Sequence, residues 1–129
     1  MKHTVREIKL SNGVSGLLID VPQAQVMSYD FTVRAGDFLA PENKWETPHV
    51  MEHLLCGANQ KFRKARTFEA EVKKNGAYTN AYTNMYNVGY VGECADFEWD
   101  RILSLLMLSI SKPLFLQEEF TAEVGSVKE

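Results

Sequence analysis

Hydrophobic and polar residues alternate in the first third of the chain, a pattern typical of β-strands. Two short strand-like runs, 4–10 and 14–21, are joined by Ser-Asn-Gly at 11–13, and Asn-Gly is a strong signal for a hairpin turn. In a third run, 25–35, every second side chain from Met27 onward is apolar and those between are polar. The pattern predicts a hairpin followed by a half-buried strand of an antiparallel sheet.

Helical spacing begins after a polar loop. We expect a short helix with Thr47 as its N-cap and Pro48 at its first position, ending at Gly57. A second helix is predicted to start at Thr67, again as N-cap, and to stop at the Asn-Gly pair 75–76.

The second half of the chain returns to strands and then to helices. Residues 77–94 are rich in Tyr, Thr and Val and predict two antiparallel strands with a turn near Asn84. Asp96 is expected to cap a long helix that runs to about Ser111, because Pro113 prevents its continuation.

A last helical segment is predicted to begin near Gln117 and to be still running at Glu129, so we expect a domain truncated within its last helix. The length of 129 residues suits one domain, 1–129, with a modest core. The order of elements predicts an α+β fold, an antiparallel sheet with helices packed mainly on one face.

Composition narrows the partners and the compartment. With 17 acidic and 14 basic residues the net charge is −3 and no basic stripe is visible, so we expect no nucleic-acid partner. No apolar run reaches the roughly 18 residues of a membrane span, and the run 102–110 fits a buried helix. The N-terminus lacks the apolar core of a signal peptide, and two cysteines make no disulfide framework. The expected setting is therefore the cytoplasm.

The segment 49–53 reads His-x-x-Glu-His. On a helix, His49 and His53 lie one turn apart on one face and can bind the same metal ion, with Glu52 on nearly the same side. Zinc held by two His and one carboxylate keeps a position open for water and lowers the pKa of that water to about 7. A neighbouring Glu can then take a proton as the water attacks a peptide carbonyl. The motif predicts zinc ligands at His49 and His53 and a catalytic base at Glu52.

Other interpretations of these residues stay open. A helix can expose a His pair and a Glu in an i,i+3 contact without binding a metal. A structural zinc site needs four Cys or His ligands, and only His49, His53 and Cys56 are close together in the sequence. Cys56 is either a soft fourth ligand or, as we favour, a small buried apolar residue.

Nearly the whole chain resembles the pitrilysin/insulinase family of zinc peptidases, the inverzincins, which include the mitochondrial processing peptidases. The motif matches in full, and further matches follow in the family's order. They are Leu-x-Asn-Gly at 10–13, Ala-Gly at 35–36, a Gly-x-x-Lys-Phe-like stretch at 57–62, Gly-x-x-x-Asn-Ala-x-Thr at 76–83, and Tyr90. The chain departs from the family just before His49, where Glu-Thr-Pro at 46–48 replaces Gly-x-Ala.

The resemblance implies that a Glu on a later helix completes the zinc site and that an earlier Glu on that helix supports the ligands. Glu123 matches the supporting residue. The ligand falls either on Glu129, with a shift of one residue, or on position 130 beyond the chain, which we favour.

The resemblance also implies a substrate and partners. Asn80 and Ala81 correspond to a strand that pairs with the backbone of an extended peptide substrate; the alternative is an edge strand without a ligand. The implied function is a zinc-dependent endopeptidase acting on unstructured peptides. Its partner is the other half of a clamshell-shaped parent, and this piece alone should have little or no activity. The resemblance leaves two alternatives undecided. The protein could form a homodimer, and it could be a non-catalytic family member that serves as a binding or assembly subunit.

Overall fold

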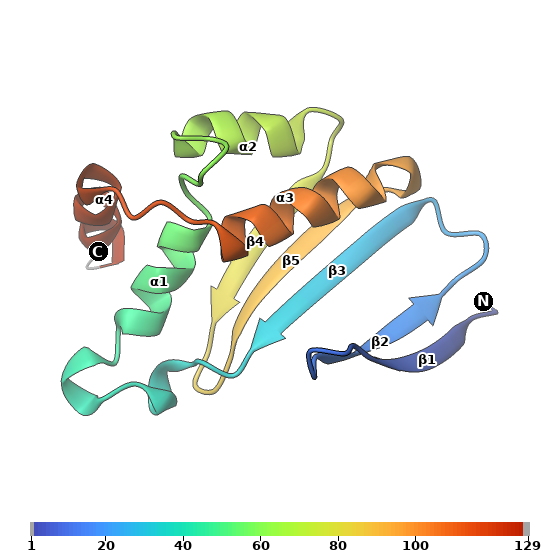
Figure 1. The fold of residues 1–129 in the computed structure, drawn as a ribbon, viewed down its shortest axis with the longest axis horizontal. Coiled ribbons are helices and arrows are strands. Elements are labelled where there is room, and N and C mark those ends of the chain that lie inside the picture. Colours follow the sequence, from blue (N-terminus) through green and yellow to red (C-terminus); the bar gives the residue numbers. More distant parts are fainter. Residues whose placement is uncertain (1, 128–129) are drawn as a thin grey trace.

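The computed structural model describes residues 2–127, and its centre is a three-stranded antiparallel sheet (Figure 1). The strands are β3 (Val26–Val33), β5 (Val88–Ala95) and β4 (Tyr78–Thr83), in that order across the sheet. Because β5 lies between the other two, β4 is an edge strand with no second strand partner among the described residues. Both strands predicted in 77–94, and the turn between them, are confirmed.

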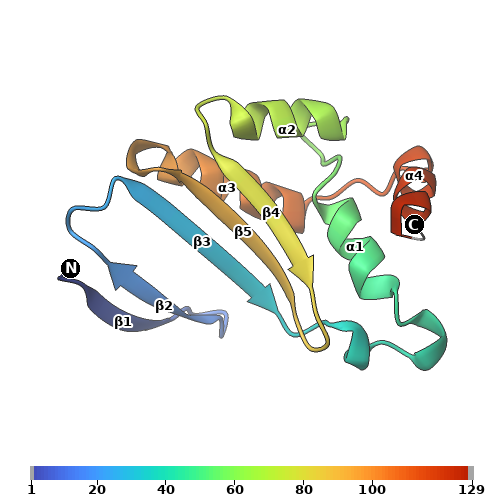
Figure 2. The same cartoon turned by 180° about the vertical axis from the view of Figure 1, so that it is seen from behind.

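Four α-helices accompany the sheet. They are α1 (Thr47–Leu55), α2 (Ala65–Lys73), α3 (Trp99–Ser111) and α4 (Gln117–Val127). Figures 1 and 2 show α3 lying across one face of the sheet, while the opposite face carries no helix. α1 runs beside β4 and contacts α4. The predicted α+β class, with helices mainly on one face, is confirmed.

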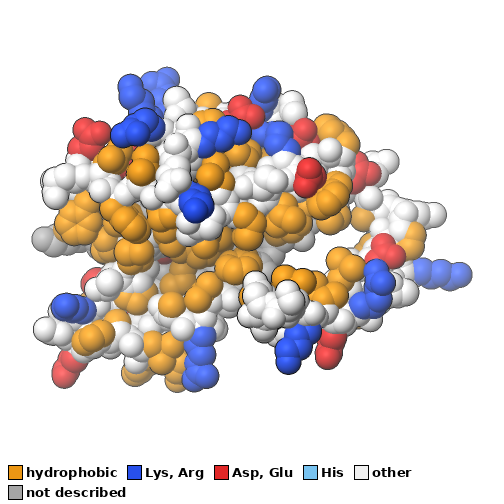
Figure 3. All heavy atoms as spheres, viewed as in Figure 1, with side chains coloured by type: hydrophobic (Ala, Val, Ile, Leu, Met, Phe, Trp, Pro, Cys, Tyr) orange, Lys and Arg blue, Asp and Glu red, His pale blue; other side chains and the backbone are white. Residues whose placement is uncertain are grey.

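The N-terminal hairpin forms a sheet of its own. β1 (Thr4–Lys9) and β2 (Ser15–Asp20) pair with each other around a turn in which Gly13 has φ +90°. The hairpin is not hydrogen-bonded to β3 as a strand, so the β-structure is divided into two sheets. Every residue of both strands is exposed, including apolar ones such as Leu17 and Ile19, and Figure 3 shows apolar side chains spread over this face of the molecule.

The core fills the space between the sheet and the helices. Ile102, on α3, is fully buried, as the apolar run 102–110 predicts for a buried helix. Side chains of β5 and α2 close over it. The buried apolar residues around it are Phe68, Val72, Ala77, Cys94 and Leu105, and a second group consists of Val88, Tyr90 and Leu106.

The predicted N-caps of α1 and α3 are wrong. Glu46, not Thr47, precedes α1, and its φ of −76° and ψ of −6° are already helical, so no extended cap residue is present. Asp96 opens a short 3-10 turn, η3 (Asp96–Glu98), and α3 starts only after it, at Trp99. Neither helix has a side-chain cap hydrogen bond, because each continues from a chain segment that is already turning.

The start of α2 is also earlier than predicted. The helix begins at Ala65, and the Thr67 hydroxyl donates a 2.7 Å hydrogen bond back to the Lys64 carbonyl instead of capping. The Ala65 N–H donates to Glu119 on the distant helix α4, at 3.4 Å. A carboxylate from another element thus occupies the place that a local cap would fill.

Gly36 joins the end of β3 to the segment that leads into α1. Its N–H donates to the Tyr86 carbonyl at 3.0 Å, within the turn between β4 and β5. A Cβ at this position would collide with backbone atoms of Asn84 and Asn87, so only glycine permits this approach. The segment before α1 contains two 3-10 turns, η1 (Asp37–Leu39) and η2 (Glu42–Lys44).

Within residues 2–127, no helix combines the length and apolar character needed to span a membrane.

Candidate metal centre

His49 and His53 present their rings side by side on α1. Their Nε2 atoms lie 3.3 Å apart, and the ring planes meet at 67° with centroids 4.9 Å apart. Both side chains are about one third exposed, at 40% and 32%, so a ligand can reach them from solvent. The motif lies on a helix, and its two imidazoles point to one shared position.

Each ring is held at its other nitrogen by a carboxylate. His53 Nδ1 lies 2.7 Å from Glu123 Oε2, and His49 Nδ1 lies 3.4 Å from Glu46 Oε2. A carboxylate accepts a hydrogen bond, so these contacts favour the tautomer with the proton on Nδ1 and leave the lone pair on Nε2. Two lone pairs then face one point, which is an arrangement that a cation stabilises.

The spacing of the two nitrogens fits zinc. Zn–N bonds of about 2.0–2.1 Å at a tetrahedral angle place two ligand nitrogens about 3.3–3.4 Å apart. The observed 3.3 Å between the Nε2 atoms agrees with that value. The distance between the two Nε2 atoms therefore permits both rings to bind one zinc ion, and it equally fits a hydrogen bond between the rings.

A third ligand is not found in the part of the chain that the structure describes. Within residues 2–127 no group of three or more His, Cys, Asp or Glu side chains is close enough together to hold a metal ion. Glu129, the candidate from the sequence, lies outside the described residues. The ligand at 129 or 130 stays a prediction.

Glu52 lies beside the histidines and is almost fully buried, at 9% exposed. The Thr83 hydroxyl, on the last residue of β4, donates a 2.9 Å hydrogen bond to Glu52 Oε2. The contact fixes one carboxylate oxygen, and Oε1 has no hydrogen-bond partner among the described protein groups. One oxygen of a held carboxylate is then available to a water molecule.

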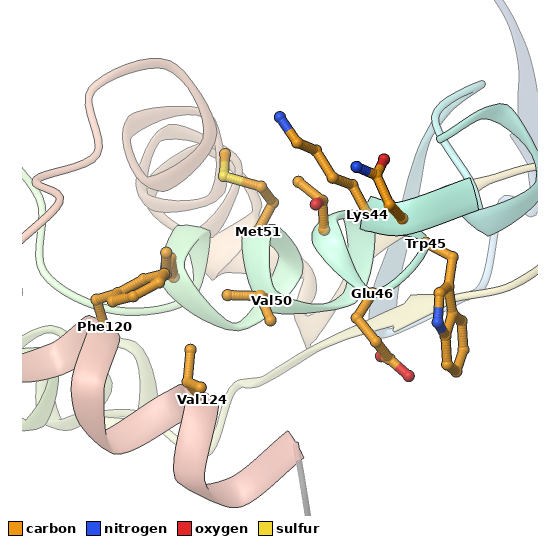
Figure 4. A pocket seen from close by; sticks show the side chains of 10 residues that line it. Lys44, Trp45, Glu46, Val50, Met51, Phe120 and Val124 are labelled. Carbon is orange, nitrogen blue, oxygen red and sulfur yellow. The ribbon is translucent and has the colours of Figure 1, made fainter. Parts of the chain in front are cut away.

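Helix α4 brings Glu123 to His53. Phe120 and Val124 point from α4 toward Val50 on α1 (Figure 4). Together with Met51 they line an apolar groove of about 360 Å³ between the two helices and the segment before α1. α4 and the motif helix contact each other, and apolar side chains from both helices line the groove between them.

Cys56 does not behave as predicted. The residue is exposed rather than buried, and it lines a hollow of about 220 Å³ beside Asn80 at the free edge of β4. Although part of the residue is accessible to solvent, the protein around the thiol desolvates it, and this effect, followed by the charges of Glu52 and Glu123, raises the pKa of the thiol to about 12. Within residues 2–127, Cys56 does not form a three-residue metal-ligating group with His49 and His53.

The sequence-predicted substrate residues lie on β4. Asn80 is exposed and Ala81 is half-buried against the core. Two residues of the site were missed by the sequence interpretation, Glu46 and Thr83. The i,i+3 spacing of Glu46 and His49 is a local signal that could have identified the first. No local signal identifies Thr83, because its contact with Glu52 depends on how β4 packs against α1.

Comparison with known proteins gives a consistent result. A family model described as Insulinase (Peptidase family M16) matches residues 17–129. The chain is 29% identical over 126 residues to the A-factor-processing enzyme of Saccharomyces cerevisiae, covering 98% of this chain and 12% of that protein. It is 30% identical over 89 residues to Insulin-degrading enzyme-like 2 of Arabidopsis thaliana, covering 69% of this chain and 9% of that protein. The chain thus spans about a tenth of the length of these relatives.

The fold recurs in a solved structure. A protease from Helicobacter pylori superposes with a TM-score of 0.87 over 98% of this chain and 30% of its own, at 21% sequence identity. Similarity at that level of identity concerns the fold alone, and it agrees with the α+β arrangement described above.

Proposed function

The chain belongs to the insulinase family of peptidases, and we propose that it forms the zinc-binding part of an endopeptidase that hydrolyses unstructured peptides. The observation that carries the proposal is the convergence of His49 Nε2 and His53 Nε2, 3.3 Å apart, next to the buried carboxylate of Glu52. Relatives named as zinc proteases support zinc as the metal.

His49 and His53 would hold the metal, and the carboxylates behind them would fix the direction of both rings. Zinc bound there would supply Lewis acidity toward water and toward a peptide carbonyl. The third ligand is proposed at position 130 or, failing that, at Glu129. Glu123 supports His53 from outside the ligand set, because its carboxylate accepts the Nδ1 hydrogen bond at 2.7 Å.

Glu52 is the proposed general base. Its carboxylate takes a proton from water as the water oxygen bonds to the carbonyl carbon. It then passes that proton to the amide nitrogen as the C–N bond breaks. The Thr83 hydroxyl keeps Oε2 in place throughout, so the proton is received at a fixed position.

Strand β4 is the proposed binding edge for the peptide backbone. Its free edge leaves backbone groups available for strand addition, which gives affinity that depends little on sequence. Asn80 is exposed on this strand, and the hollow of about 220 Å³ beside it, which Phe68 and Thr79 also line, can receive a side chain. Asn80 and Ala81 are therefore proposed as substrate-binding residues.

The remainder of a longer parent protein is the proposed partner. The relatives are several times longer, and this chain exposes many apolar side chains on its hairpin and around β3. Because residues 2–127 contain no group of three side chains that could hold a metal ion, we expect little activity from this piece alone.

The direct test uses the full-length protein. Glu52→Gln should abolish cleavage of an unstructured peptide while the zinc content stays at the wild-type level. Loss of zinc together with activity would give Glu52 a ligand or structural role instead. A wild-type protein that binds zinc but cleaves no unstructured peptide would support the non-catalytic alternative, a binding or assembly subunit.

A further inference from the structure

The carboxylate of Glu119 ties α4 to two other parts of the chain. Its Oε2 accepts a hydrogen bond from the Ala58 N–H at 3.1 Å, in the loop after α1. Its Oε1 accepts a longer one, 3.4 Å, from the N–H of Ala65, the first residue of α2. The start of a helix has unpaired N–H groups and a positive dipole end, so a carboxylate is stabilised there.

The loop that Glu119 contacts is itself firmly held. Asn59 is fully buried, and its side-chain oxygen accepts hydrogen bonds from the N–H groups of Lys61 and Phe62, at 3.2 and 3.0 Å. The same loop is bonded on its other side to the segment 112–114, which leads into α4. The Ala58 N–H that donates to Glu119 thus belongs to a loop that is hydrogen-bonded on both sides.

Gly57 makes room for this carboxylate. A Cβ added at Gly57 would lie 3.0 Å from Glu119 Oε2 and 3.2 Å from the Leu54 carbonyl oxygen. Both distances are tighter than ordinary van der Waals contact, so a side chain here would displace Glu119 or the end of α1.

Glu123 follows Glu119 by one helical turn and lies on the same face of α4. Glu119 holds the loop and the start of α2, while Glu123 holds His53 Nδ1 at 2.7 Å. The contact of Glu119 with the loop and the contact of Glu123 with His53 are thus made from the same position of α4.

We propose that Glu119 is a positioning residue for the metal centre, acting through Glu123 on the imidazole of His53. This inference rests on the proposed function, since it concerns the zinc site. Glu119 contacts neither the metal position nor the substrate edge. Its effect on zinc binding passes through the placement of α4.

A double-mutant cycle in the full-length protein tests the proposal. The variants are Glu119→Gln, Glu123→Gln and the two combined, and the control is Glu118→Gln, which changes an exposed carboxylate next in sequence. The measurement is the dissociation constant for zinc, obtained by competition with a chelator. Glu119→Gln and Glu123→Gln should each weaken zinc binding by about 10-fold or more. The control should stay within about twofold.

The combined variant separates positioning from general stability. If Glu119 acts through Glu123, removing it in the Glu123→Gln protein should weaken zinc binding by no more than about a further twofold. Full additivity would overturn the proposal, because Glu119 would then act on the fold by another route. An unchanged affinity in Glu119→Gln alone would overturn it as well.

Hydrogen–deuterium exchange of the zinc-free protein gives a readout that does not depend on the metal. Backbone exchange in residues 117–127 should become faster in Glu119→Gln and in Gly57→Ala, a variant that adds no charge, and should stay unchanged in Glu118→Gln. Unchanged exchange in the first two would contradict the proposal. If the wild-type protein bound no zinc, the proposed function would fail, and the exchange data would still decide the role of Glu119.

Discussion

The hydroxyl of Thr83 donates a 2.9 Å hydrogen bond to the carboxylate of Glu52, which links the last residue of the edge strand β4 to the motif helix α1. The strand that carries the proposed substrate residues Asn80 and Ala81 therefore also holds the proposed general base. A substrate that pairs with β4 would be placed in register with the base by the same element.

Thr83→Val keeps the shape of the side chain and removes the hydroxyl. A hydrogen bond to a charged group contributes about 1.5–3 kcal/mol, so we expect kcat to fall by about 10- to 100-fold with the zinc affinity unchanged. Thr83→Ser retains the hydroxyl and should keep most of the activity. Steady-state kinetics of the two variants check the prediction. Equal losses of kcat in Thr83→Val and Thr83→Ser would contradict it.

The two carboxylates behind the histidines should differ in importance. Glu123 lies 2.7 Å from His53 Nδ1, whereas Glu46 lies 3.4 Å from His49 Nδ1 on the same helix. The shorter hydrogen bond is the stronger one, and loss of such a partner weakens metal binding by about 10- to 100-fold. Glu123→Gln should therefore raise the zinc dissociation constant more than Glu46→Gln does. The reverse order would show that Glu46 is the main support.

Tyr90 gives a prediction about alkaline pH. Burial raises the pKa of its phenol above the usual value, and the neighbouring Cys56 and Glu52 raise it further. Above about pH 10 the unfolded chain loses this proton first, so the stability that Tyr90 contributes is lost as pH rises. In urea unfolding from pH 8 to 11, Tyr90→Phe should show a shallower fall in stability than the wild type. Tyr86→Phe, at an exposed tyrosine, should follow the wild type.

Two glycines should respond to alanine in opposite directions. Gly36→Ala places a Cβ against the backbone of the turn between β4 and β5, and overpacking of this kind costs about 1–3 kcal/mol. Gly125 lies inside α4 with open space around it, so Gly125→Ala should stabilise the protein by about 0.5–1 kcal/mol. Thermal unfolding of both variants measures the difference. Stabilisation by Gly36→Ala would contradict the close approach seen at this junction.

Local patterns were sufficient to predict the strands, the motif helix and the fold class, because alternation and helical spacing are properties of neighbouring residues. The predicted cap at Thr67 failed for a physical reason. Glu119, more than fifty positions away, supplies the acceptor at the start of α2, and the helix begins earlier. The contact between Thr83 and Glu52 was likewise beyond local interpretation, since it forms only when β4 and α1 are packed together.

The metal centre also contains one contact that sequence spacing predicts and one that it does not. The pairing of His49 and His53 follows from their i,i+4 spacing, whereas the contact of Glu123 with His53 joins residues 70 positions apart. Its placement was inferred from the family resemblance, and the geometry of α4 supplies the physical reason for it. The third ligand, at 129 or 130, still rests on that resemblance alone.

X-ray absorption at the zinc edge in the full-length protein tests the central claim most directly. We predict two imidazole nitrogens and a carboxylate oxygen bound to zinc at about 2.0–2.2 Å, and the loss of one imidazole in His53→Ala. A spectrum without imidazole scattering, or one that His53→Ala leaves unchanged, would contradict the claim that the two histidines of α1 hold the metal.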